Sequence, residues 1–433
     1  MKIQFIGIGG VGISALAKWM LSKGHEISGI NDSESLKTLG ELYDKGVEIK
    51  IGTDKELLDK EADLYVYSVA WLERAPEMME LALESGKAKS YFEALGHFAS
   101  EMEVIAVSGT HGKTTTTAML HSILDAHDFD HTTIVGSVLA SEGSNFIASK
   151  NKSDFLLVEA CEYRRHFLHF EPSVLVVTNI EAEHLDYYKD LDDVKSAFRE
   201  LARQSKSGAR IVANLKDENV SSALEGISKE LIDYNAFLSD VPSLSLPGEH
   251  NALNAAAALA AAAAVLKEKF SLKKAQAALA EFKGTWRRFE KLGKLQSGAT
   301  LVSDYAHHPS EIKATLKATK SFMQKRDRAG EIFAIFEPHT YSRAKALADE
   351  FAESFGEAAK VYVLPIYAAR EKEIPGVSSG FLAEKINAKT HNAEAVDFEK
   401  AVQEILKISK SGDLVLGLGA GDIDQKLRNL IKK

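Results

Sequence analysis

The feature that most constrains the fold of this chain is a strand-like run followed by a glycine-rich loop and a helical pattern. Residues Val104–Val107 are apolar, as in a buried strand. Ser-Gly-Thr-His-Gly-Lys-Thr-Thr follows at residues 108–115, with a helix expected from about Thr114. Backbone N–H groups at such a helix start can cradle phosphates. The lysine can reach the β and γ oxygens, and a threonine hydroxyl can ligate Mg²⁺. This arrangement predicts a nucleotide-binding α/β protein.

The loop departs from the strict phosphate-loop pattern Gly-x4-Gly-Lys-Ser/Thr. Val107 stands where that pattern has its first glycine, so the remaining signal is Gly109-Thr-His-Gly112-Lys113-Thr114. A helix N-cap with a chance glycine and lysine is the alternative interpretation. The order of strand, loop and helix favours phosphate binding over that alternative.

A second glycine-rich turn, Gly7-Ile-Gly-Gly-Val-Gly12, follows the strand pattern Ile3–Ile6 and precedes a helix. Glycines in this position allow a tight turn and let a diphosphate approach the helix start closely. The next strand, Glu26–Ile30, ends beside Asn31 and Asp32, about where an acid would hold a ribose. The turn does not choose among UDP, NAD and FAD, because each carries a diphosphate. A packing turn without a ligand is the remaining interpretation.

Strand and helix patterns alternate along the whole chain and divide it into three blocks, with boundaries near residues 100 and 284. At roughly 100 to 200 residues per domain, 433 residues suffice for several domains. Alternation of this kind predicts parallel sheets covered by helices. In the third block, buried strands are expected at Thr300–Ser303, Ile332–Phe336, Lys360–Leu364 and Asp413–Leu418.

Composition narrows the function classes. The net charge of −9, from 53 basic and 62 acidic residues, argues against a nucleic-acid-binding surface. A single cysteine, Cys161, excludes an intramolecular disulfide and fits a reducing cytoplasm. No signal peptide is evident, and the longest apolar run, Ala255–Leu266, is shorter than the about 20 residues of a membrane span. We therefore expect a cytoplasmic protein without a membrane span.

Polar side chains follow two buried strand patterns of the second block. Glu159 and Glu162 come after Phe155–Val158, and His184 lies in the segment after Val174–Val177. Both groups are expected at the carboxyl ends of a parallel sheet, beside the phosphate loop. Carboxylates there would complete a Mg²⁺ shell. A histidine taken alone is more often structural, but a neighbouring ATP site favours a functional role for His184.

Further polar clusters lie later in the chain. His250, Asn251 and Asn254 begin the alanine-rich helix, where they could bind an adenine edge or cap the helix. Arg287 and Arg288 stand at a block boundary, where they could reach a phosphate in trans or form a solvated charge pair. Two more clusters follow strands, and one carries adjacent histidines that could bind a metal: Asp304–Pro309 and Glu337–Arg343.

Taken in order, these motifs resemble those of the Mur ligases of peptidoglycan synthesis, over nearly the whole chain. Any one motif is weak evidence, but the whole set in the family's order is specific. The resemblance is carried by Gly7–Ser14, Gly109–Thr115, Thr178–Asp186, Pro247–Asn254, Arg287–Phe289, Asp304–Pro309, Pro338–Arg343 and Gly419–Ile423.

The resemblance implies an α/β fold of three domains. These are a Rossmann-like UDP-substrate-binding domain at residues 1–100, a central P-loop ATPase-type parallel-sheet domain that binds ATP at 101–284, and a C-terminal Rossmann-like domain at 285–433. The implied activity is ligation of L-alanine to the carboxylate of UDP-N-acetylmuramate, with ATP and Mg²⁺, through an acyl phosphate. A monomer or a homodimer is expected.

Other functions stay open beside this one. Within the family, the alternative is a recycling ligase that adds an intact tripeptide to UDP-N-acetylmuramate. From other classes, the glycine turn alone would fit a nicotinamide-dependent oxidoreductase, which gives the phosphate loop and Arg288 no role. A P-loop NTPase switch would leave the first and third blocks unexplained.

Carried over residue by residue, the resemblance places Lys113 on the β- and γ-phosphates and Arg288 near the γ-phosphate. Together with Glu159 and His184 they form the expected catalytic set. The expected Mg²⁺ ligands are Thr114 and Glu159 for a first ion and His184 for a second. The expected nucleotide-binding residues are Gly109, Thr110, His111, Gly112, Lys113, Thr114, Thr115, His250, Asn251, Asn254, Arg288 and Asp304. The expected substrate-binding residues are Gly9, Gly10, Val11, Gly12, Asp32, Ser68, Tyr305, His307, His339 and Arg343.

The chain departs from the family pattern at three places. Many relatives have Glu-Ala-Asp-Glu-Ser-Asp where this chain has Glu159-Ala-Cys-Glu-Tyr-Arg164, which leaves the role of Glu162 undecided. Asn31 precedes Asp32 where relatives often end the motif Ser-Gly-Ser-Asp, so the uridine-side contact is open. Phe198 stands where some Mur ligases carry a carbamylated lysine, so we expect no such modification.

Overall fold

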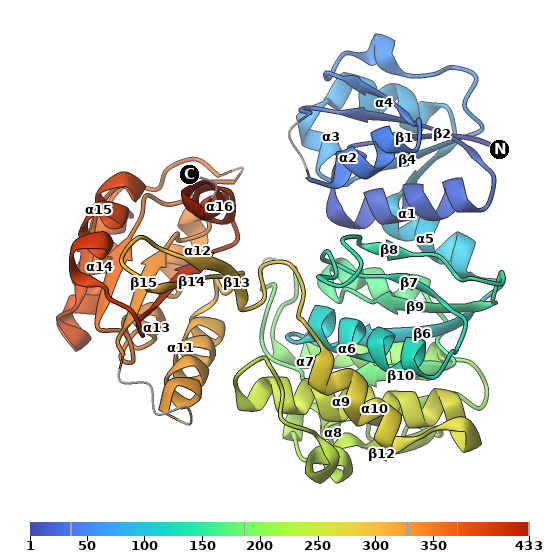
Figure 1. The fold of residues 1–433 in the computed structure, drawn as a ribbon. Coiled ribbons are helices and arrows are strands. Elements are labelled where there is room, and N and C mark those ends of the chain that lie inside the picture. The colour runs from blue at the N-terminus through green and yellow to red at the C-terminus, as the bar shows by residue number, and fades with distance from the viewer. Residues whose placement is uncertain (35–36, 186, 325–329, 370, 432–433) are drawn as a thin grey trace. The chain divides into compact units, whose positions relative to one another are not determined.

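The computed structural model describes residues 1–34, 37–185, 187–324, 330–369 and 371–431. Asp186, the last residue of one motif above, lies outside this part. In the described residues the strands form three sheets with helices packed on them (Figure 1). The predicted α/β class is therefore confirmed. The chain divides into two compact units: residues 1–244 with 252–283, and residues 245–251 with 284–433.

The first sheet is parallel, with strand order β3-β2-β1-β4-β5. It is Rossmann-like, because β1 lies in the middle and the chain crosses to either side of it. The strands are β1 (Lys2–Ile6), β2 (Glu26–Asn31), β3 (Glu48–Ile51), β4 (Leu64–Tyr67) and β5 (Ala88–Ser90). The helices are α1 (Val11–Ser22), α2 (Lys37–Asp44), α3 (Trp71–Arg74), α4 (Pro76–Glu84) and α5 (Tyr91–Ala99), with the 3₁₀ turn η1 (Lys55–Leu57).

The second sheet has strand order β12-β11-β10-β6-β9-β7-β8, and its described pairs are parallel except for the β7–β8 hairpin. The strands are β6 (Glu103–Ser108), β7 (Thr132–Ile134), β8 (Phe146–Ile147), β9 (Phe155–Glu159), β10 (Val174–Val177), β11 (Arg210–Ala213) and β12 (Glu230–Asp233). The helices and 3₁₀ turns are α6 (Lys113–Ala126), η2 (Tyr163–His169), α7 (Leu191–Gln204), α8 (Glu218–Ala223), η3 (Tyr234–Asp240), α9 (Glu249–Leu266), η4 (Lys267–Lys269) and α10 (Leu272–Glu281).

The third sheet has strand order β13-β14-β18-β15-β16-β17, with β13 antiparallel to β14 and the other described pairs parallel. The strands are β13 (Glu290–Lys294), β14 (Thr300–Asp304), β15 (Ile332–Phe336), β16 (Lys360–Val363), β17 (Ala393–Ala395) and β18 (Leu414–Leu418). The helices are α11 (Pro309–Gln324), α12 (Tyr341–Ala346), α13 (Ala348–Ala352), α14 (Ser379–Thr390), α15 (Phe398–Ile408) and α16 (Ile423–Ile431).

One hydrophobic core runs through the first and second sheets. Trp19 of α1, Leu95 of α5, Phe146 of β8 and Leu175 of β10 belong to the same buried cluster. Burying such a side chain stabilises the fold by about 1.5 to 3 kcal/mol, so a shared core holds the two sheets together strongly. This is why residues of both sheets lie in one compact unit. The domain boundaries expected at residues 100 and 284 stay predictions.

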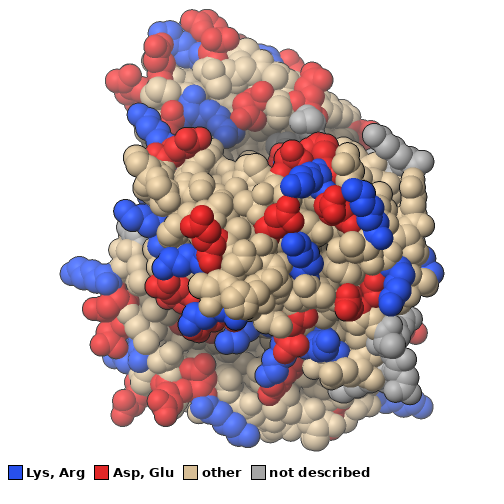
Figure 2. Space-filling model, turned by 90° about the vertical axis from the view of Figure 1, so that its left-hand side faces the viewer, with Lys and Arg blue, Asp and Glu red and all other residues tan. Residues whose placement is uncertain are grey.

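Two surface properties bear on the class of protein. Lysine and arginine side chains are interspersed with aspartate and glutamate over the face in Figure 2. Among the described helices, none combines the length and the apolar character that a bilayer crossing requires.

Candidate nucleotide and substrate sites

The phosphate loop joins β6 to α6 and depends on two glycines. Gly109 has φ +134° and Gly112 has φ +85°, a region that side chains with a Cβ rarely adopt. A Cβ on Gly109 would lie 1.9 Å from Thr178 Oγ1, and one on Gly112 would lie 2.3 Å from Asn254 Oδ1. Both the backbone conformation and the close packing therefore require glycine here.

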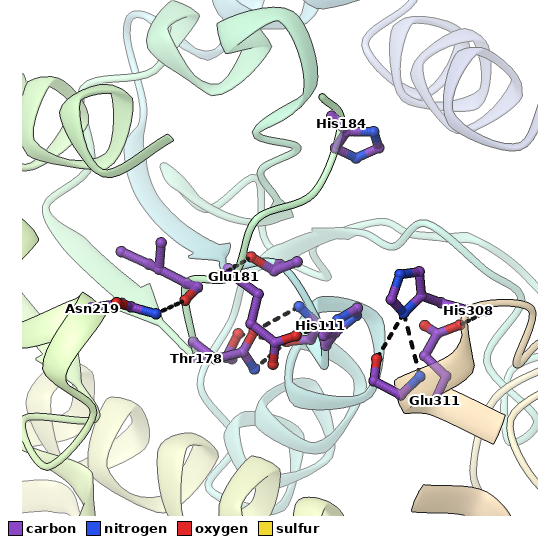
Figure 3. Close-up of polar contacts among 12 residues, drawn as sticks. His111, Thr178, Glu181, His184, Asn219, His308 and Glu311 are labelled. Atoms are coloured by element: carbon purple, nitrogen blue, oxygen red, sulfur yellow. Dashed lines mark hydrogen bonds and ion pairs between the residues drawn. The ribbon is translucent and has the colours of Figure 1, made fainter. Parts of the chain in front are cut away.

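Side chains that follow β10 fix the shape of the loop (Figure 3). Thr178 Oγ1 donates to the His111 carbonyl at 2.6 Å, and the Asn179 amide bonds to His111 N and O at 2.8 and 3.1 Å. Glu181 N donates to Thr110 Oγ1 at 2.9 Å. The Glu181 carboxylate lies 3.4 Å from His111 Nε2. These contacts hold the loop in place before α6 begins at Lys113, where helix N–H groups lack intrahelical partners.

Lys113 forms a buried ion pair with Glu162. The Lys113 ammonium lies 2.8 Å from Glu162 Oε2 and also donates to the carbonyls of Gly109 and Thr110, at 2.6 and 2.9 Å. The side chain of Glu162 is only 2% exposed. Burial alone would lower the pKa of Lys113, but the neighbouring Glu162 carboxylate raises it above its ordinary value. Burial likewise opposes ionisation of Glu162, and Lys113 holds the pKa of that carboxyl below its usual range. Both groups are thus charged near neutral pH.

The same carboxylate also meets His184. Glu162 Oε1 lies 3.4 Å from His184 Nε2, so one buried carboxylate lies between the loop lysine and the expected metal ligand. The Tyr163 ring centroid is 4.7 Å from that of His184. His184 itself has φ +56°, which turns the chain sharply after β10. Glu162 was left undecided from the sequence, and its position three residues after Glu159 was the available signal.

Thr114 and Glu159 bring oxygen atoms together at the start of α6. Thr114 Oγ1 donates to Glu159 Oε2 at 2.8 Å, and Gly136 N donates to the same oxygen at 2.9 Å. A hydroxyl and a carboxylate are the hard oxygen ligands that Mg²⁺ prefers, so this pair fits the ion. Within the described ranges, no three His, Cys, Asp or Glu side chains converge on one point. His184 contacts Glu162 rather than this oxygen pair.

The glycine turn of the first sheet is held by Asn31 rather than by Asp32. Gly9 N donates to Asn31 Oδ1 at 3.1 Å, and Thr38 Oγ1 donates to Gly9 O at 2.6 Å. Asn31 is 3% exposed, whereas Asp32 forms an ion pair with Arg74 nearer the surface. Asn31 was outside the expected set, although its place at the end of β2 was a usable signal.

The remaining expected residues of this unit lie around the same turn. Gly10 is the N-cap of α1, and Val11 and Gly12 form its first turn. The Tyr91 ring packs so closely on Gly12 that a Cβ there would lie 2.8 Å from it. Ser68 directly follows the neighbouring strand β4, and its N–H donates to Ile6 O at 3.0 Å.

In the C-terminal unit, two arginines flank one aromatic ring. The guanidinium carbons of Arg287 and Arg288 lie 4.8 and 5.1 Å from the centroid of the Tyr305 ring. Arg287 is 8% exposed and donates to the carbonyl of Gly419, whereas Arg288 is half-buried. Contacts of this geometry are favourable cation–π interactions. Arg288 is thus the more accessible of the pair for an anionic ligand.

Asp304, expected among the nucleotide-binding residues, binds backbone in this structure. Its Oδ2 accepts from Phe289 N at 2.7 Å and its Oδ1 accepts from Ala306 N at 2.8 Å. Burial raises the pKa of Asp304, and the Arg288 charge opposes that rise. Asp304 therefore ties the arginine segment to the end of β14.

The other expected substrate residues of this unit cluster at two strand ends. The ring centroids of His307 and His339 are 5.8 Å apart, and Tyr367 stacks on His339 at 5.6 Å. Burial, followed by the charge of His307, lowers the pKa of His339 to about 4. Arg343 lies on α12, and its charge acts in the same direction. His339 is therefore neutral near neutral pH.

The three expected adenine-side residues are divided between the two compact units. Asn254 belongs with the loop, and its Oδ1 accepts from Thr116 Oγ1 at 3.3 Å. His250 and Asn251 belong to the C-terminal unit, where Asn251 Nδ2 donates to Pro247 O at 2.7 Å. Burial, followed by the Arg288 charge, lowers the pKa of His250.

The parallel sheets and the loop between β6 and α6 are typical of nucleotide-binding α/β enzymes. Family models match three stretches: Mur ligase family catalytic domain (residues 2–102), Mur ligase middle domain (107–237) and Mur ligase glutamate ligase domain (287–421). The chain is 37% identical to the UDP-N-acetylmuramate–L-alanine ligase of Caldicellulosiruptor saccharolyticus, over 100% of this chain and 98% of that protein. The chain belongs to the Mur ligase family, as its motifs predicted.

Solved structures show the same fold. The UDP-N-acetylmuramate–alanine ligase of Thermotoga maritima superposes with a TM-score of 0.81 at 25% identity, covering 100% of this chain and 98% of that one. A murein peptide ligase from Psychrobacter arcticus gives a TM-score of 0.71 at 24% identity, with the same coverage. At that identity the second likeness concerns the fold alone.

Proposed function

We propose that this chain joins L-alanine to the carboxylate of UDP-N-acetylmuramate, with ATP as the second substrate. The observation that carries the proposal is the buried Glu162 carboxylate, 2.8 Å from Lys113 and 3.4 Å from His184. It links the phosphate loop to the segment where the family resemblance puts the substrate carboxylate. The full-length relative at 37% identity, which bears the name of this activity, supports the same assignment.

The chemistry accounts for these residue types. A carboxylate is a poor electrophile, and transfer of a γ-phosphoryl group converts it to a reactive acyl phosphate. Two anions must approach each other first, so the Lys113 ammonium offsets their repulsion at the loop. Thr114 and Glu159 would hold one Mg²⁺ and His184 a second, and these ions supply further positive charge when bound. Glu162 keeps Lys113 protonated and oriented for this role.

Groups of the C-terminal unit would serve the phosphate and the amino acid. Arg288 is the expected partner of the γ-phosphate. Tyr305, His307, His339 and Arg343 are the expected contacts of the incoming amino acid and of the substrate carboxylate. The amine must attack as the free base, so a nearby acceptor for its proton would assist the reaction. Exclusion of water would protect the acyl phosphate from hydrolysis.

The second candidate within the family is the tripeptide-recycling ligase. The murein peptide ligase likeness is compatible with it in fold, but the full-length relative favours the single amino acid. For the proposed L-alanine ligase we also expect a cytoplasmic location and a monomeric or homodimeric state.

We expect phosphate release from ATP only when UDP-N-acetylmuramate and L-alanine are both present. We also expect kcat/KM for L-alanine to exceed that for the tripeptide by at least about tenfold, because fit to the chosen amine is worth more than about 1.4 kcal/mol. A coupled phosphate assay with alanine, glycine, serine and tripeptide measures both. Equal or better turnover of the tripeptide would exclude the single-amino-acid assignment. Release with neither substrate would favour an NTPase switch.

A further inference from the structure

A buried lysine of α1 lies outside every site described above. The Lys18 side chain is 2% exposed, yet its ammonium has three partners on other elements. It donates to Asn145 Oδ1 at 2.8 Å and to Ser144 Oγ at 3.4 Å, and it pairs with the Glu41 carboxylate of α2. Ser144 Oγ in turn donates to Glu41 at 2.8 Å. Burial lowers the pKa of Lys18, and Glu41 opposes this. A buried ammonium is retained only where it is paired in this way.

Asn145 is fully buried and directs both ends of its amide at α1. Its Nδ2 donates to the Val11 carbonyl and to Ser14 Oγ, the latter at 3.0 Å, while its Oδ1 accepts from Lys18. These three α1 residues are three and four positions apart, so they share one face of the helix. An ammonium can only donate, so Lys18 fixes which end of the amide faces it. The NH₂ group is thereby directed at Val11.

The segment that carries Asn145 also reaches the loop site. Residues 135–145 connect β7 to β8, and Val135 N donates to Asn145 O at 3.1 Å. Gly136 of this connection donates to Glu159 Oε2 at 2.9 Å. Figure 1 shows α1 next to the β7 and β8 strands. One short connection therefore contacts the start of α1 at one end and the Glu159 carboxylate at the other.

We infer that Asn145 is a positioning residue for the diphosphate of the UDP substrate, and that Lys18 orients its amide. The amide fixes the first turn of α1, and the N–H groups of that turn are the ones a diphosphate would meet. This inference rests on the proposed function, because it assumes a diphosphate ligand at the glycine turn. The competing explanation is that these polar contacts merely join the first sheet to the second. The side chains concerned are Lys18, Glu41, Ser144 and Asn145.

Asn145→Asp separates these explanations. Aspartate has nearly the same volume and still offers an oxygen to Lys18, so the Lys18 contact that joins the two sheets would survive. It offers no N–H to Val11 and sets an oxygen against that carbonyl. We expect Kd for UDP-N-acetylmuramate to rise about tenfold, the loss of one well-placed hydrogen bond. We expect Kd for ATP, measured below the melting temperature of the variant, to change less than about twofold.

Calorimetric titration of each ligand measures these constants. Lys18→Met should also weaken UDP-substrate binding, because the amide loses the contact that orients it. Lys23→Met is the matched control, since that residue is exposed at the end of the same helix and should bind as the parent does. An unchanged Kd in Asn145→Asp, or an equal loss for ATP, would overturn the inference.

Hydrogen exchange keeps the test independent of the assigned substrate. In the ligand-free chain, Asn145→Asp should speed amide exchange in residues 14–16 at least about fivefold, while α6 exchanges at the parent rate. If the parent itself fails to bind UDP-N-acetylmuramate, the proposed function is wrong. The exchange rate in residues 14–16 then remains the test of the positioning role of Asn145. Parent-like exchange in α1 would contradict that role whatever the substrate.

Discussion

Lys113→Met is expected to lower kcat by at least about a thousandfold, because it removes the one loop ammonium that can offset phosphate charge during transfer. Kd for UDP-N-acetylmuramate, titrated without ATP, should stay within about twofold of the parent value, since the glycine turn belongs to another sheet. Steady-state phosphate release gives kcat, and calorimetry gives the binding constant. A large fall in kcat with an unchanged Kd for UDP-N-acetylmuramate would assign Lys113 to the phosphates of ATP.

This variant needs a second one beside it, because the ion pair of Lys113 is buried. Methionine would leave Glu162 charged at 2% exposure without its ammonium, and such an unpaired charge can unfold the site. Lys113→Met combined with Glu162→Gln removes both charges. We expect the double variant to regain melting temperature but not turnover. Turnover above about a tenth of the parent in either folded variant would contradict the loop role of Lys113.

Glu162→Gln is expected to have the second largest effect, on both stability and activity. Glutamine removes the negative charge that pairs with the Lys113 ammonium and leaves it only neutral acceptors such as the Gly109 and Thr110 carbonyls. Breaking a buried pair costs about 3 kcal/mol or more, which urea denaturation would detect. We also expect kcat to fall about a hundredfold, because Lys113 and His184 both lose the negative charge that orients them.

Glu181→Gln is the matched control for this prediction. Glu181 also lies beyond a central strand, but its side chain is 51% exposed, and its carboxylate lies 3.4 Å from His111 Nε2. Exposed pairs contribute little, so stability and kcat should stay near the parent values. If Glu162→Gln and Glu181→Gln lowered stability and kcat equally, the buried Lys113–Glu162 pair would have no special role.

Long apolar strands were predictable from the sequence, and short edge strands were not. The expected strands at 300–303, 332–336 and 413–418 match β14, β15 and β18 within a residue, because central parallel strands are apolar on both faces. β13 and β17 were missed. β13 is partly exposed, contains Gly293 and has an irregular register with β14, and β17 has only three residues. Such strands depend on their neighbours rather than on their own pattern.

The site was predictable where a motif sits at a strand end. Lys113, Thr114 and Glu159 lie together because β6 and β9 are neighbours in the sheet. Glu162 was expected beside the loop, but its contacts with Lys113 and His184 were not predicted, because the chain after it turns through Arg164 and Arg165 at φ +50° and +59°, which spacing does not reveal.

Contacts between distant segments were harder still to foresee. Asn145 meets Val11 across 134 residues of sequence. The residue types do not predict such a contact, because asparagine is also common in turns and helix caps. Only the packing of α1 against the β7–β8 connection brings the two groups together.

The measurement that tests the central claim most directly follows one oxygen atom. UDP-N-acetylmuramate labelled with ¹⁸O in its carboxylate is turned over with ATP and L-alanine, and the released phosphate is analysed by mass spectrometry. If the loop transfers the γ-phosphoryl group to the substrate carboxylate, amide formation leaves one labelled oxygen in the phosphate. Released phosphate that carries oxygen only from ATP and water would contradict the account, because ATP would then be hydrolysed without activating the carboxylate.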